Sequence, residues 1–466
     1  MRKNLVLLLL ICACCAHRLP YSAGQAPSDA LLERADTYKA GGRYLEALSL
    51  YRDIAMNPAW EERAGAPLYL SMADIYRDYL GDTVQADVWY SHYRAHAPGA
   101  PAAPAIDKRV LAADQPMPAC IRVLVADSSG PVRMASGTPL KISGGSAAPG
   151  SAGSTIVCSA DNNSIIVNNG EPIYGPVRVT PADGQSVFLE GKAYRGLLTL
   201  TAAKGRLLVV NHIPLDDYLC GVLPKEMAPS WPLEALKAQA VAARTYALYH
   251  MLLRRSDAYD VLSTTSSQVY GGSEKDYPAV RSAVDAARGL VLAEGGRLAL
   301  TLFHANSGGM TESCENIWGG RLAYLSSVED PFSKNRPGDA WEKTLTAEEI
   351  TAACVQFGIA AGAVKEIAPV ERSASGRIKK LKVVTDSQTF FLSGNSFRLI
   401  VGPGKIKGAN FEVQKQKGQF VFNGNGYGHG AGMSQWGAYG MAKKGYDCAA
   451  ILGHYYPGTT MLRIAR

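Results

Sequence analysis

The segment that decides the fold is residues 211–248, with the sequence NHIPLDDYLCGVLPKEMAPSWPLEALKAQAVAARTYAL. Within it, Glu226 lies between Pro224 and Pro229. Proline interrupts regular helices and restricts the residue that precedes it, so we expect the Glu226 carboxyl group on a shaped turn. A carboxyl group held in this way is the first candidate for a catalytic residue.

A long helix is predicted directly after this glutamate. Ser230 has the residue type of a helix N-cap, and Pro232 falls in the first turn, where its missing N–H costs little. Helix-favouring residues then continue to about Leu253. An apolar stripe with helical spacing is expected to face a core. It consists of Leu233, Leu236, Ala240, Ala243 and Ala247.

Cations and aromatic residues follow a second stripe of the same helix. Lys237 and Arg244 are seven residues apart and therefore fall on one side of a helix. With Trp231 and Tyr246, they suit an anionic substrate built of rings, such as an acidic polysaccharide, because ammonium and guanidinium groups pair with carboxylates. An amphipathic helix with a solvated cationic face is an equally good interpretation of the two cations.

Residues 211–248 are the first of four blocks that together resemble the SpoIID/LytB family of cell-wall proteins. The other blocks begin at Tyr259, Gly289 and Gly426. They read YDVLSTTSSQVYGG, GLVLAEGGRLALTLFHANSGGMTES and GYGHGAGMSQWGAYGMAKKGYDCAAILGHYYPGT. Four blocks in the same order are more specific than any single motif. The resemblance covers the chain from about residue 121 to its end.

The resemblance implies a peptidoglycan lytic transglycosylase. Such an enzyme cleaves the MurNAc–GlcNAc bond of glycan strands and leaves 1,6-anhydro-MurNAc ends. One carboxyl group suffices, since it first protonates the leaving oxygen and then accepts the proton of the muramic acid 6-hydroxyl. Glu226 takes this catalytic position. The residues that the resemblance implies for substrate binding are Lys237, Arg244, Tyr246, Gln268, Tyr270, His304, Ser307, His429 and Gln435.

Two alternatives remain open for this region. Family members also act as amidase enhancers, so the chain could be a non-catalytic glycan-binding protein that recruits or enhances a cell-wall amidase. No cofactor is expected, but zinc at His304 is an alternative, although a pair of His304 and Cys314 falls short of a full ligand set. Trp318 and Tyr324 are either sugar platforms or core residues. His429 is either a groove residue or a buried histidine.

Composition and the amino terminus indicate where the protein works. The chain has 466 residues, 47% of them hydrophobic and 19% charged, which is typical of a globular protein. Its net charge of +7 is spread without the long Lys/Arg blocks of a nucleic-acid binder, so no nucleic acid is expected as partner. The charge is compatible with an anionic wall polymer or membrane surface, and a role in solubility is an equally good interpretation. Residues 1–23 resemble an export signal, which predicts a periplasmic or cell-envelope protein. The signal either ends at a lipidated Cys14, the only membrane attachment expected, or is cut after Ala16 or Ala23.

Three further regions are predicted along the chain. Residues 28–98 resemble two tetratricopeptide-type (TPR-like) helical hairpins, which would dock on a neighbouring domain, another copy or a wall protein such as an amidase. Residues 99–119 are rich in Pro and Ala and should form a linker. Residues 120–466 predict an α+β catalytic domain, with a mainly antiparallel, partly barrel-like sheet and helices around a glycan groove. Its six cysteines are compatible with disulfides and with buried thiols.

Overall fold

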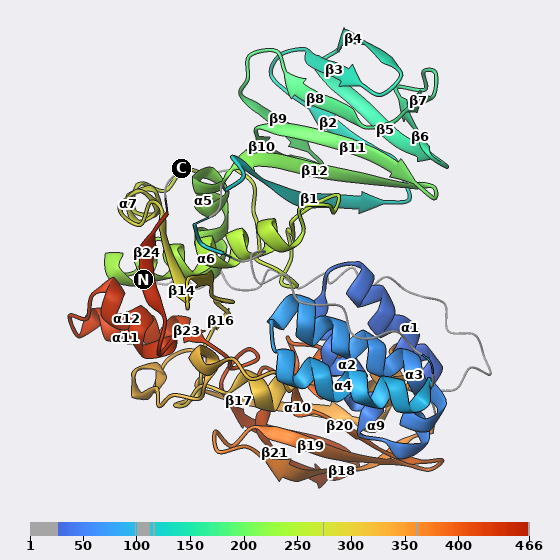
Figure 1. The fold of residues 1–466 in the computed structure, drawn as a ribbon, viewed down its shortest axis with the longest axis vertical. Coiled ribbons are helices and arrows are strands. Elements are labelled where there is room, and N and C mark those ends of the chain that lie inside the picture. The colour runs from blue at the N-terminus through green and yellow to red at the C-terminus, as the bar shows by residue number, and fades with distance from the viewer. Residues whose placement is uncertain are drawn as a thin grey trace. The chain divides into compact units, whose positions relative to one another are not determined.

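The computed structural model describes residues 27–97, 99, 112–114, 117–273, 275–359 and 362–464. The predicted export signal and most of the predicted linker lie outside these residues. The chain forms two compact units (Figure 1). Unit 1 combines Met1–Ile106 with Phe303–Gly437, and unit 2 combines Asp107–Leu302 with Ala438–Arg466. Each unit is therefore built from two separate stretches of sequence.

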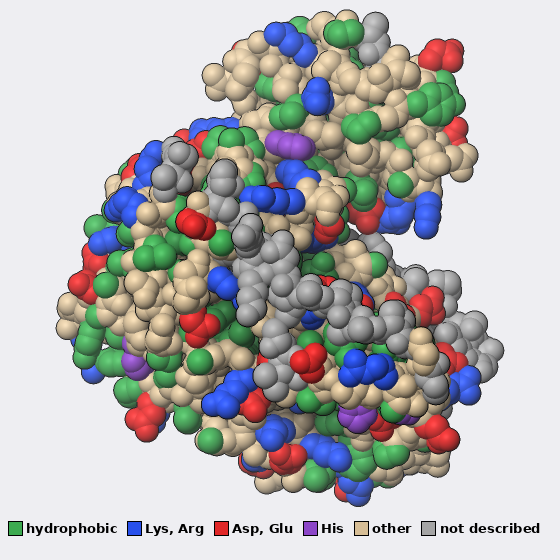
Figure 2. Space-filling view, in the orientation of Figure 1, with side chains coloured by type: hydrophobic (Ala, Val, Ile, Leu, Met, Phe, Trp, Pro, Cys, Tyr) green, Lys and Arg blue, Asp and Glu red, His purple; other side chains and the backbone are tan. Residues whose placement is uncertain are grey.

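The predicted α+β class is confirmed. Almost all strand pairs are antiparallel, and the parallel ones are β1 with β13 and β16 with β23. In the described part of the chain every sheet has an open strand order, so no sheet closes into a barrel. Side chains of both charges are interspersed over the face shown in Figure 2, in keeping with the modest net charge.

Two sheets form the β-rich part of unit 2. The strand orders are β13-β1-β12-β11-β8-β3-β4 and β10-β9-β2-β5-β6-β7. They pack on each other through alternate side chains, and Val123, Met134, Ile156 and Val209 are fully buried there. The strands are β1 Cys120–Ser128, β2 Val132–Ala135, β3 Leu140–Gly144, β4 Ala147–Ala152, β5 Thr155–Asp161, β6 Ser164–Val167, β7 Ile173–Tyr174, β8 Val177–Pro181, β9 Ser186–Leu189, β10 Lys192–Arg195, β11 Leu197–Ala203, β12 Arg206–Pro214 and β13 Val261–Leu262.

The helical part of unit 2 surrounds one central helix, α6. Apart from Lys237, residues 235–252 of this helix are buried, because α5, α7, α12 and β14 pack around it. A three-stranded sheet of order β15-β14-β24 completes this part. The elements are α5 Leu215–Glu226, α6 Leu233–Leu253, α7 Pro278–Ala286, β14 Leu290–Glu294, β15 Arg297–Leu298, α12 Cys448–Tyr455 and β24 Thr460–Arg463.

The start of α6 differs from the prediction. The N-cap is Pro232, in an extended conformation and with no side-chain cap, so Ser230 does not cap this helix. Leu233 is 48% exposed because it occupies the first turn, whereas the other four residues of the predicted apolar stripe are fully buried. Glu226 is the last residue of α5 and does not lie on a separate turn. Pro224 lies inside this helix, two residues before its end, and has no N–H to donate to the carbonyl oxygen of Cys220.

Unit 1 begins with four helices that pack as two hairpins, α1 with α2 and α3 with α4. The predicted helical character of this region is confirmed, while its relation to TPR repeats stays a prediction. A π-helical turn, η1, joins α3 to α4 and ends at Gly81 in the left-handed conformation. The elements are α1 Pro27–Ala40, α2 Tyr44–Ala55, α3 Pro58–Asp74, η1 Ile75–Leu80 and α4 Thr83–His96.

The second stretch of unit 1 contains three small sheets. Their strand orders are β17-β22-β21, β18-β19-β20 and β16-β23. Helix α9 begins with a capping box between Thr346 and Glu349, which explains its sharp start. The elements are β16 Phe303–His304, α8 Cys314–Trp318, η2 Ala323–Leu325, η3 Pro331–Ser333, β17 Ala340–Thr346, α9 Ala347–Gln356, β18 Val364–Arg372, β19 Ile378–Thr385, β20 Thr389–Leu392, α10 Gly394–Val401, β21 Asn410–Gln416, β22 Gln419–Asn425 and β23 Met433–Ser434, followed by α11 Gln435–Lys443 at the boundary of the units.

Two further findings concern the whole described chain. None of its described helices has the length and apolar character that crossing a membrane requires. The six cysteines beyond the predicted signal are all thiols, and four of them are buried. The sequence is compatible with disulfides and with buried thiols, and the structure shows thiols.

Candidate functional site

Glu226 lies at the carboxyl end of α5 and is half-buried. Its Oε1 accepts a hydrogen bond from the backbone N–H of Val269, at 3.3 Å. The neighbouring Lys225 is exposed, and its aliphatic chain lies over Gly271. The segment of residues 268–272 thus runs along the end of α5 and presents a backbone donor to the carboxyl group.

A buried layer of polar side chains fixes this segment. The Tyr218 hydroxyl donates to Oε1 of Gln268 at 3.1 Å, and Nε2 of Gln268 donates to the carbonyl oxygen of Ala243 at 3.3 Å. The Tyr270 hydroxyl donates to Oδ1 of Asn211 at 3.0 Å. Burial raises the pKa of both tyrosine hydroxyls, so they remain donors. Gln268 and Tyr270 are 1% and 3% exposed and therefore hold the loop from inside.

Close backbone packing requires a glycine on α5 at this place. A Cβ atom on Gly221 would lie 2.5 Å from the Gly272 carbonyl oxygen and 2.5 Å from the ring of Tyr270. The N–H of Gly271 donates to the carbonyl oxygen of Gly221 at 3.1 Å. Helix α5 and the segment of residues 268–272 are thus in direct backbone contact.

Arg244 lies in the interior of unit 2, with 1% of its surface exposed. Its guanidinium forms an ion pair with Asp216 at 2.9 Å and donates to the carbonyl oxygens of Ala287 and Val284. These partners come from α5 and α7 and from the residue after α7. The structure gives Arg244 a packing role between three helices, and not the solvent-facing cationic stripe that the sequence predicts.

The surroundings of Lys237 differ from those of Arg244. The Lys237 ammonium group lies on the half-buried side of α6 and pairs with Glu234 at 2.9 Å. The same Glu234 accepts the N–H of Cys448 at the start of α12, at 2.8 Å. Tyr246 is 6% exposed, and its ring centre is 4.3 Å from that of His250. Of the predicted binding residues on α6, Lys237 is the one that keeps substantial exposure.

The predicted residues of unit 1 centre on His304, at the end of β16. Its Nδ1 faces the carbonyl oxygen of Ala431 at 3.1 Å, and because a carbonyl only accepts, Nδ1 carries the proton. The Nε2 atom is buried and has no hydrogen-bond partner among the described residues. Burial, with His429 and Arg377 nearby, holds the His304 pKa well below its usual range. His304 is 4% exposed, so it is not an open substrate-binding residue of the kind that the resemblance implies.

His429 lies next to His304 and is half-buried. The ring centres of the two histidines are 5.6 Å apart, and that of Trp318 is 5.3 Å from His429. Nδ1 of His429 accepts the N–H of Ala431. Burial, Arg398 and Arg377 lower the pKa of His429 to about 3, which makes it a neutral ring at physiological pH. Trp318 is 3% exposed and backs this ring, so it is a core residue and not an open sugar platform.

Ser307 and Gln435 are also buried, at 2% and 5% exposure. The Ser307 hydroxyl donates to Asp330 at 2.7 Å. For the predicted zinc alternative, the Cys314 thiol bonds to the carbonyl oxygen of Gly320, and no three His, Cys, Asp or Glu side chains converge as metal ligands in the described ranges. Zinc at His304 therefore stays a prediction that lacks a ligand set.

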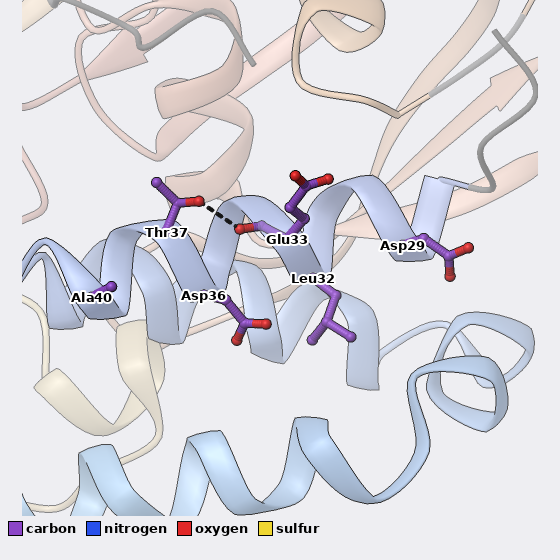
Figure 3. Close-up of a pocket in the computed structure, with 6 residues that line it drawn as sticks. All are labelled: Asp29, Leu32, Glu33, Asp36, Thr37 and Ala40. Carbon is purple, nitrogen blue, oxygen red and sulfur yellow. Dashed lines mark hydrogen bonds between the residues drawn. The ribbon is translucent and has the colours of Figure 1, made fainter. Parts of the chain in front are cut away.

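Two cavities are lined by residues other than Glu226. One occupies a single face of α1 and is lined by Asp29, Leu32, Glu33, Asp36, Thr37 and Ala40 (Figure 3). The other lies beside α5 and includes Cys220, Asp217 and Arg281, the last two forming an ion pair at 3.1 Å. Burial raises the pKa of the Cys220 thiol to about 11, which opposes a nucleophilic role.

The structure brings the predicted residues together in two groups. Glu226, Gln268 and Tyr270 share the end of α5 in unit 2, and His304 and His429 share the β16–β23 region in unit 1. Tyr218 and Asn211 support the first group and were missed from the sequence. Tyr218 precedes Glu226 by eight residues, a helical spacing that would have been visible had α5 been predicted to continue through Pro224.

Comparisons with known proteins match two separate regions of the chain. Residues 203–293, which contain Glu226 and Gln268, match the family described as Stage II sporulation protein, SpoIID. Residues 315–432 match a domain of unknown function, DUF8618. The region that carries Glu226 and the region that carries Trp318 and His429 thus match different family models.

Three relatives define the wider similarity. The chain is 37% identical to an uncharacterized protein of Brachyspira hyodysenteriae, in an alignment covering 59% of this chain and 73% of the relative. It is 30% identical to stage II sporulation protein D of Bacillus subtilis, covering 54% and 75%. It is 29% identical to the amidase enhancer of Bacillus subtilis, covering 59% of this chain but 45% of that relative. The chain belongs to the SpoIID family.

Proposed function

We propose that this protein is a lytic transglycosylase that cleaves the glycan strands of the cell wall, with Glu226 as its single acid/base. The observation that carries the proposal is the position of this carboxyl group. It is half-exposed at the end of α5, inside the SpoIID-matched region, and accepts a backbone N–H from Val269. A fixed donor of this kind orients a carboxyl group for proton transfer.

The other described carboxylates of residues 203–293 have structural partners. Each forms an ion pair with an arginine or lysine, which ties it to the fold. They are Asp216, Asp217, Glu234, Asp257, Asp260, Asp276 and Asp285. Asp260, for example, is 3% exposed and pairs with Arg122 at 2.6 Å.

The proposed reaction moves one proton out and one proton back. The protonated Glu226 gives its proton to the glycosidic oxygen as the bond from that oxygen to C1 of the muramic acid breaks. The resulting carboxylate takes the proton of the 6-hydroxyl, whose oxygen bonds to C1 and closes the 1,6-anhydro ring. No water is consumed, and Glu226 ends as it began.

We assign the predicted binding residues to two roles according to the exposure of their side chains. Lys237 and His429 keep exposed surface, so we assign them contacts with sugar or carboxylate groups. The remaining ones are buried, and we assign them the positioning of the contacting groups. They are Arg244, Tyr246, Gln268, Tyr270, His304, Ser307 and Gln435. The proposal places the protein at the cell envelope, where this polymer lies.

A second function has its own observation in favour. The relative named amidase enhancer aligns over 322 residues. In this alternative the chain binds glycan strands without cutting them and recruits or stimulates a wall amidase. Its distinguishing property is that the Glu226 carboxyl group is dispensable.

The test compares the wild type with Glu226→Gln on denuded glycan strands, with products identified by mass spectrometry. We expect 1,6-anhydro-MurNAc ends from the wild type and a loss of at least about 100-fold for the variant, because a general acid contributes about that much or more. Glu294→Gln, which changes an exposed glutamate of β14, is the matched control and should retain activity. Strand binding by all three proteins without anhydro products would overturn the proposal and support the alternative.

A further inference from the structure

The N-terminal helices of unit 1 are anchored to the later part of the same unit by buried and part-buried hydrogen bonds. Figure 1 shows these helices in blue beside the orange strands β19 and β20. Asn57 bonds to both backbone groups of Phe391 on β20, and Asp53 accepts the N–H of Ser393 at 2.9 Å. The Trp60 ring stacks on Phe390 with ring centres 5.7 Å apart. The partner of this helical surface is therefore the chain itself.

A second set of contacts reaches the α8 region. The Tyr76 hydroxyl in η1 donates to the carbonyl oxygen of Trp318 at 2.5 Å, and Asp82 accepts the N–H of Arg321 at 2.7 Å. Between these two bonds, Gly319 and Gly320 have no room for side chains. A Cβ atom on Gly319 would lie 2.3 Å from the Tyr76 oxygen, and one on Gly320 would lie 2.6 Å from Leu80. Tyr76, Leu80 and Asp82 thus hold the backbone of residues 318–321 by direct contacts, and we call this set of contacts the grip.

This grip adds to the contacts that α8 makes within its own region, which include the Ser313 cap and the bonds of the Cys314 thiol to Gly320 and Leu322. Helix α8 has only five residues, and so short a helix is not stable by itself. The indole N–H of Trp318 is buried without a hydrogen-bond partner in the described part of the chain, so no polar contact of the ring fixes its orientation. The position of the ring follows from its packing and from whatever holds its backbone.

The Trp318 ring in turn packs against His429. Their ring centres are 5.3 Å apart, and His429 is the half-exposed member of the pair. A direct path of contacts therefore runs from the Tyr76 hydroxyl through the Trp318 backbone and ring to His429. Each step lies within unit 1 and involves buried or half-buried groups.

We propose that the N-terminal helices position His429 for glycan contact, with Tyr76 and Asp82 as positioning residues that act through Trp318. The glycan part of this inference rests on the proposed function, whereas the coupling from Tyr76 to His429 does not. Loss of the grip leaves Trp318 free to shift and changes the surroundings of the His429 ring. The sugar contact of His429 then weakens although no residue that touches the sugar has changed.

Two perturbations of the grip have matched controls. Tyr76→Phe removes the hydroxyl bonded to Trp318, and Tyr90→Phe removes a hydroxyl that bonds to Asp74 within the helices alone. Gly320→Ala inserts a methyl group against Leu80. Gly404→Ala adds the same group in the same unit, where nothing lies within 4 Å. All four variants are made in the full chain.

The readout is the NMR signal of the His429 ring, assigned by its loss in His429→Gln, together with hydrogen exchange over residues 314–322. Tyr76→Phe and Gly320→Ala should shift the His429 signal and speed this exchange, and should weaken binding of denuded glycan strands several-fold. Tyr90→Phe and Gly404→Ala should do neither. An unchanged His429 signal in both test variants, or an equal shift in the controls, overturns the inference. This readout involves no cleavage, so a failure of the transglycosylase proposal would leave it intact and would be recognised separately.

Discussion

Arg244 and Asp216 form an ion pair with an N···O distance of 2.9 Å in the interior of unit 2. Arg244 is 1% exposed and Asp216 is 7% exposed. The pair joins α5, which ends at Glu226, to the central helix α6. The sequence pattern assigns Arg244 to substrate binding. In the structure, this arginine instead holds α5, the helix that ends at Glu226.

The first prediction concerns this pair. Arg244→Met should lower the free energy of unfolding by about 3–5 kcal/mol, because it leaves the Asp216 carboxylate buried with its main partner removed. Urea unfolding measures the change. Lys237→Met removes the more exposed pair with Glu234 and should cost about 1 kcal/mol or less. Equal stability losses in the two variants would contradict the packing role of Arg244.

The second prediction concerns Gly221. Gly221→Ala should reduce both stability and glycan-strand cleavage, since its methyl group would collide with Gly272 and Tyr270 and displace the segment that carries Val269. Gly453→Ala in α12, where nothing lies within 4 Å, should be neutral or stabilising by about 0.4–1 kcal/mol. Thermal unfolding and the anhydro-product assay provide the two measurements. Full cleavage activity in a folded Gly221→Ala protein would refute the proposed role of this contact.

The third prediction concerns pH. Burial raises the pKa of Asp53 from its usual 3.8 to about 7 in the folded protein. The folded state therefore keeps the proton that the unfolded state releases, and this stabilisation, complete below pH 4, is lost as the pH rises to about 7. The difference amounts to at most about 4 kcal/mol. Asp53→Asn keeps an acceptor for Ser393 and should lose less stability between pH 4 and pH 7 than the wild type, as measured by urea unfolding across this range. Parallel stability curves would contradict the raised pKa.

The fourth prediction concerns the edge of β20. The Asn57 side chain accepts the Phe391 N–H at 2.8 Å and donates to the Phe391 carbonyl oxygen at 2.9 Å, as a neighbouring strand would. Asn57→Ala should lower the free energy of unfolding by about 1–3 kcal/mol, since two part-buried backbone groups of Phe391 lose their partner. Hydrogen exchange of the Phe391 amide should accelerate. Asn57→Asp, which retains only the acceptor, should protect this amide better than alanine does, and the reverse order would speak against the side-chain pairing.

The sequence predicted the classes of structure better than the roles of single residues. The α+β class and the helix to Leu253 follow from local patterns, because the spacing of apolar residues acts within a few positions. Burial depends on what packs from elsewhere in the chain. Arg244 and Tyr270 were therefore expected at a substrate surface, and they lie inside.

Helix boundaries show the same division. Pro224 and Ser230 carry strong local signals for a break and for a cap, but tertiary packing around α5 and α6 places the helix end at Glu226 and the N-cap at Pro232. The link between Tyr218 and Gln268 spans 50 positions, and that between Tyr76 and Trp318 spans 242. Contacts between residues so distant in the chain leave no periodic signal in a single sequence.

The docking of the N-terminal helices also has a consequence for biosynthesis. Their apolar surface, including Trp60 and Tyr76, is covered by residues such as Phe390 and Trp318, which leave the ribosome hundreds of residues later. Unit 2 is translated in the interval, apart from its last strand and helices. The nascent helices must therefore stay uncovered, or be sheltered by a chaperone, until their intramolecular partner emerges.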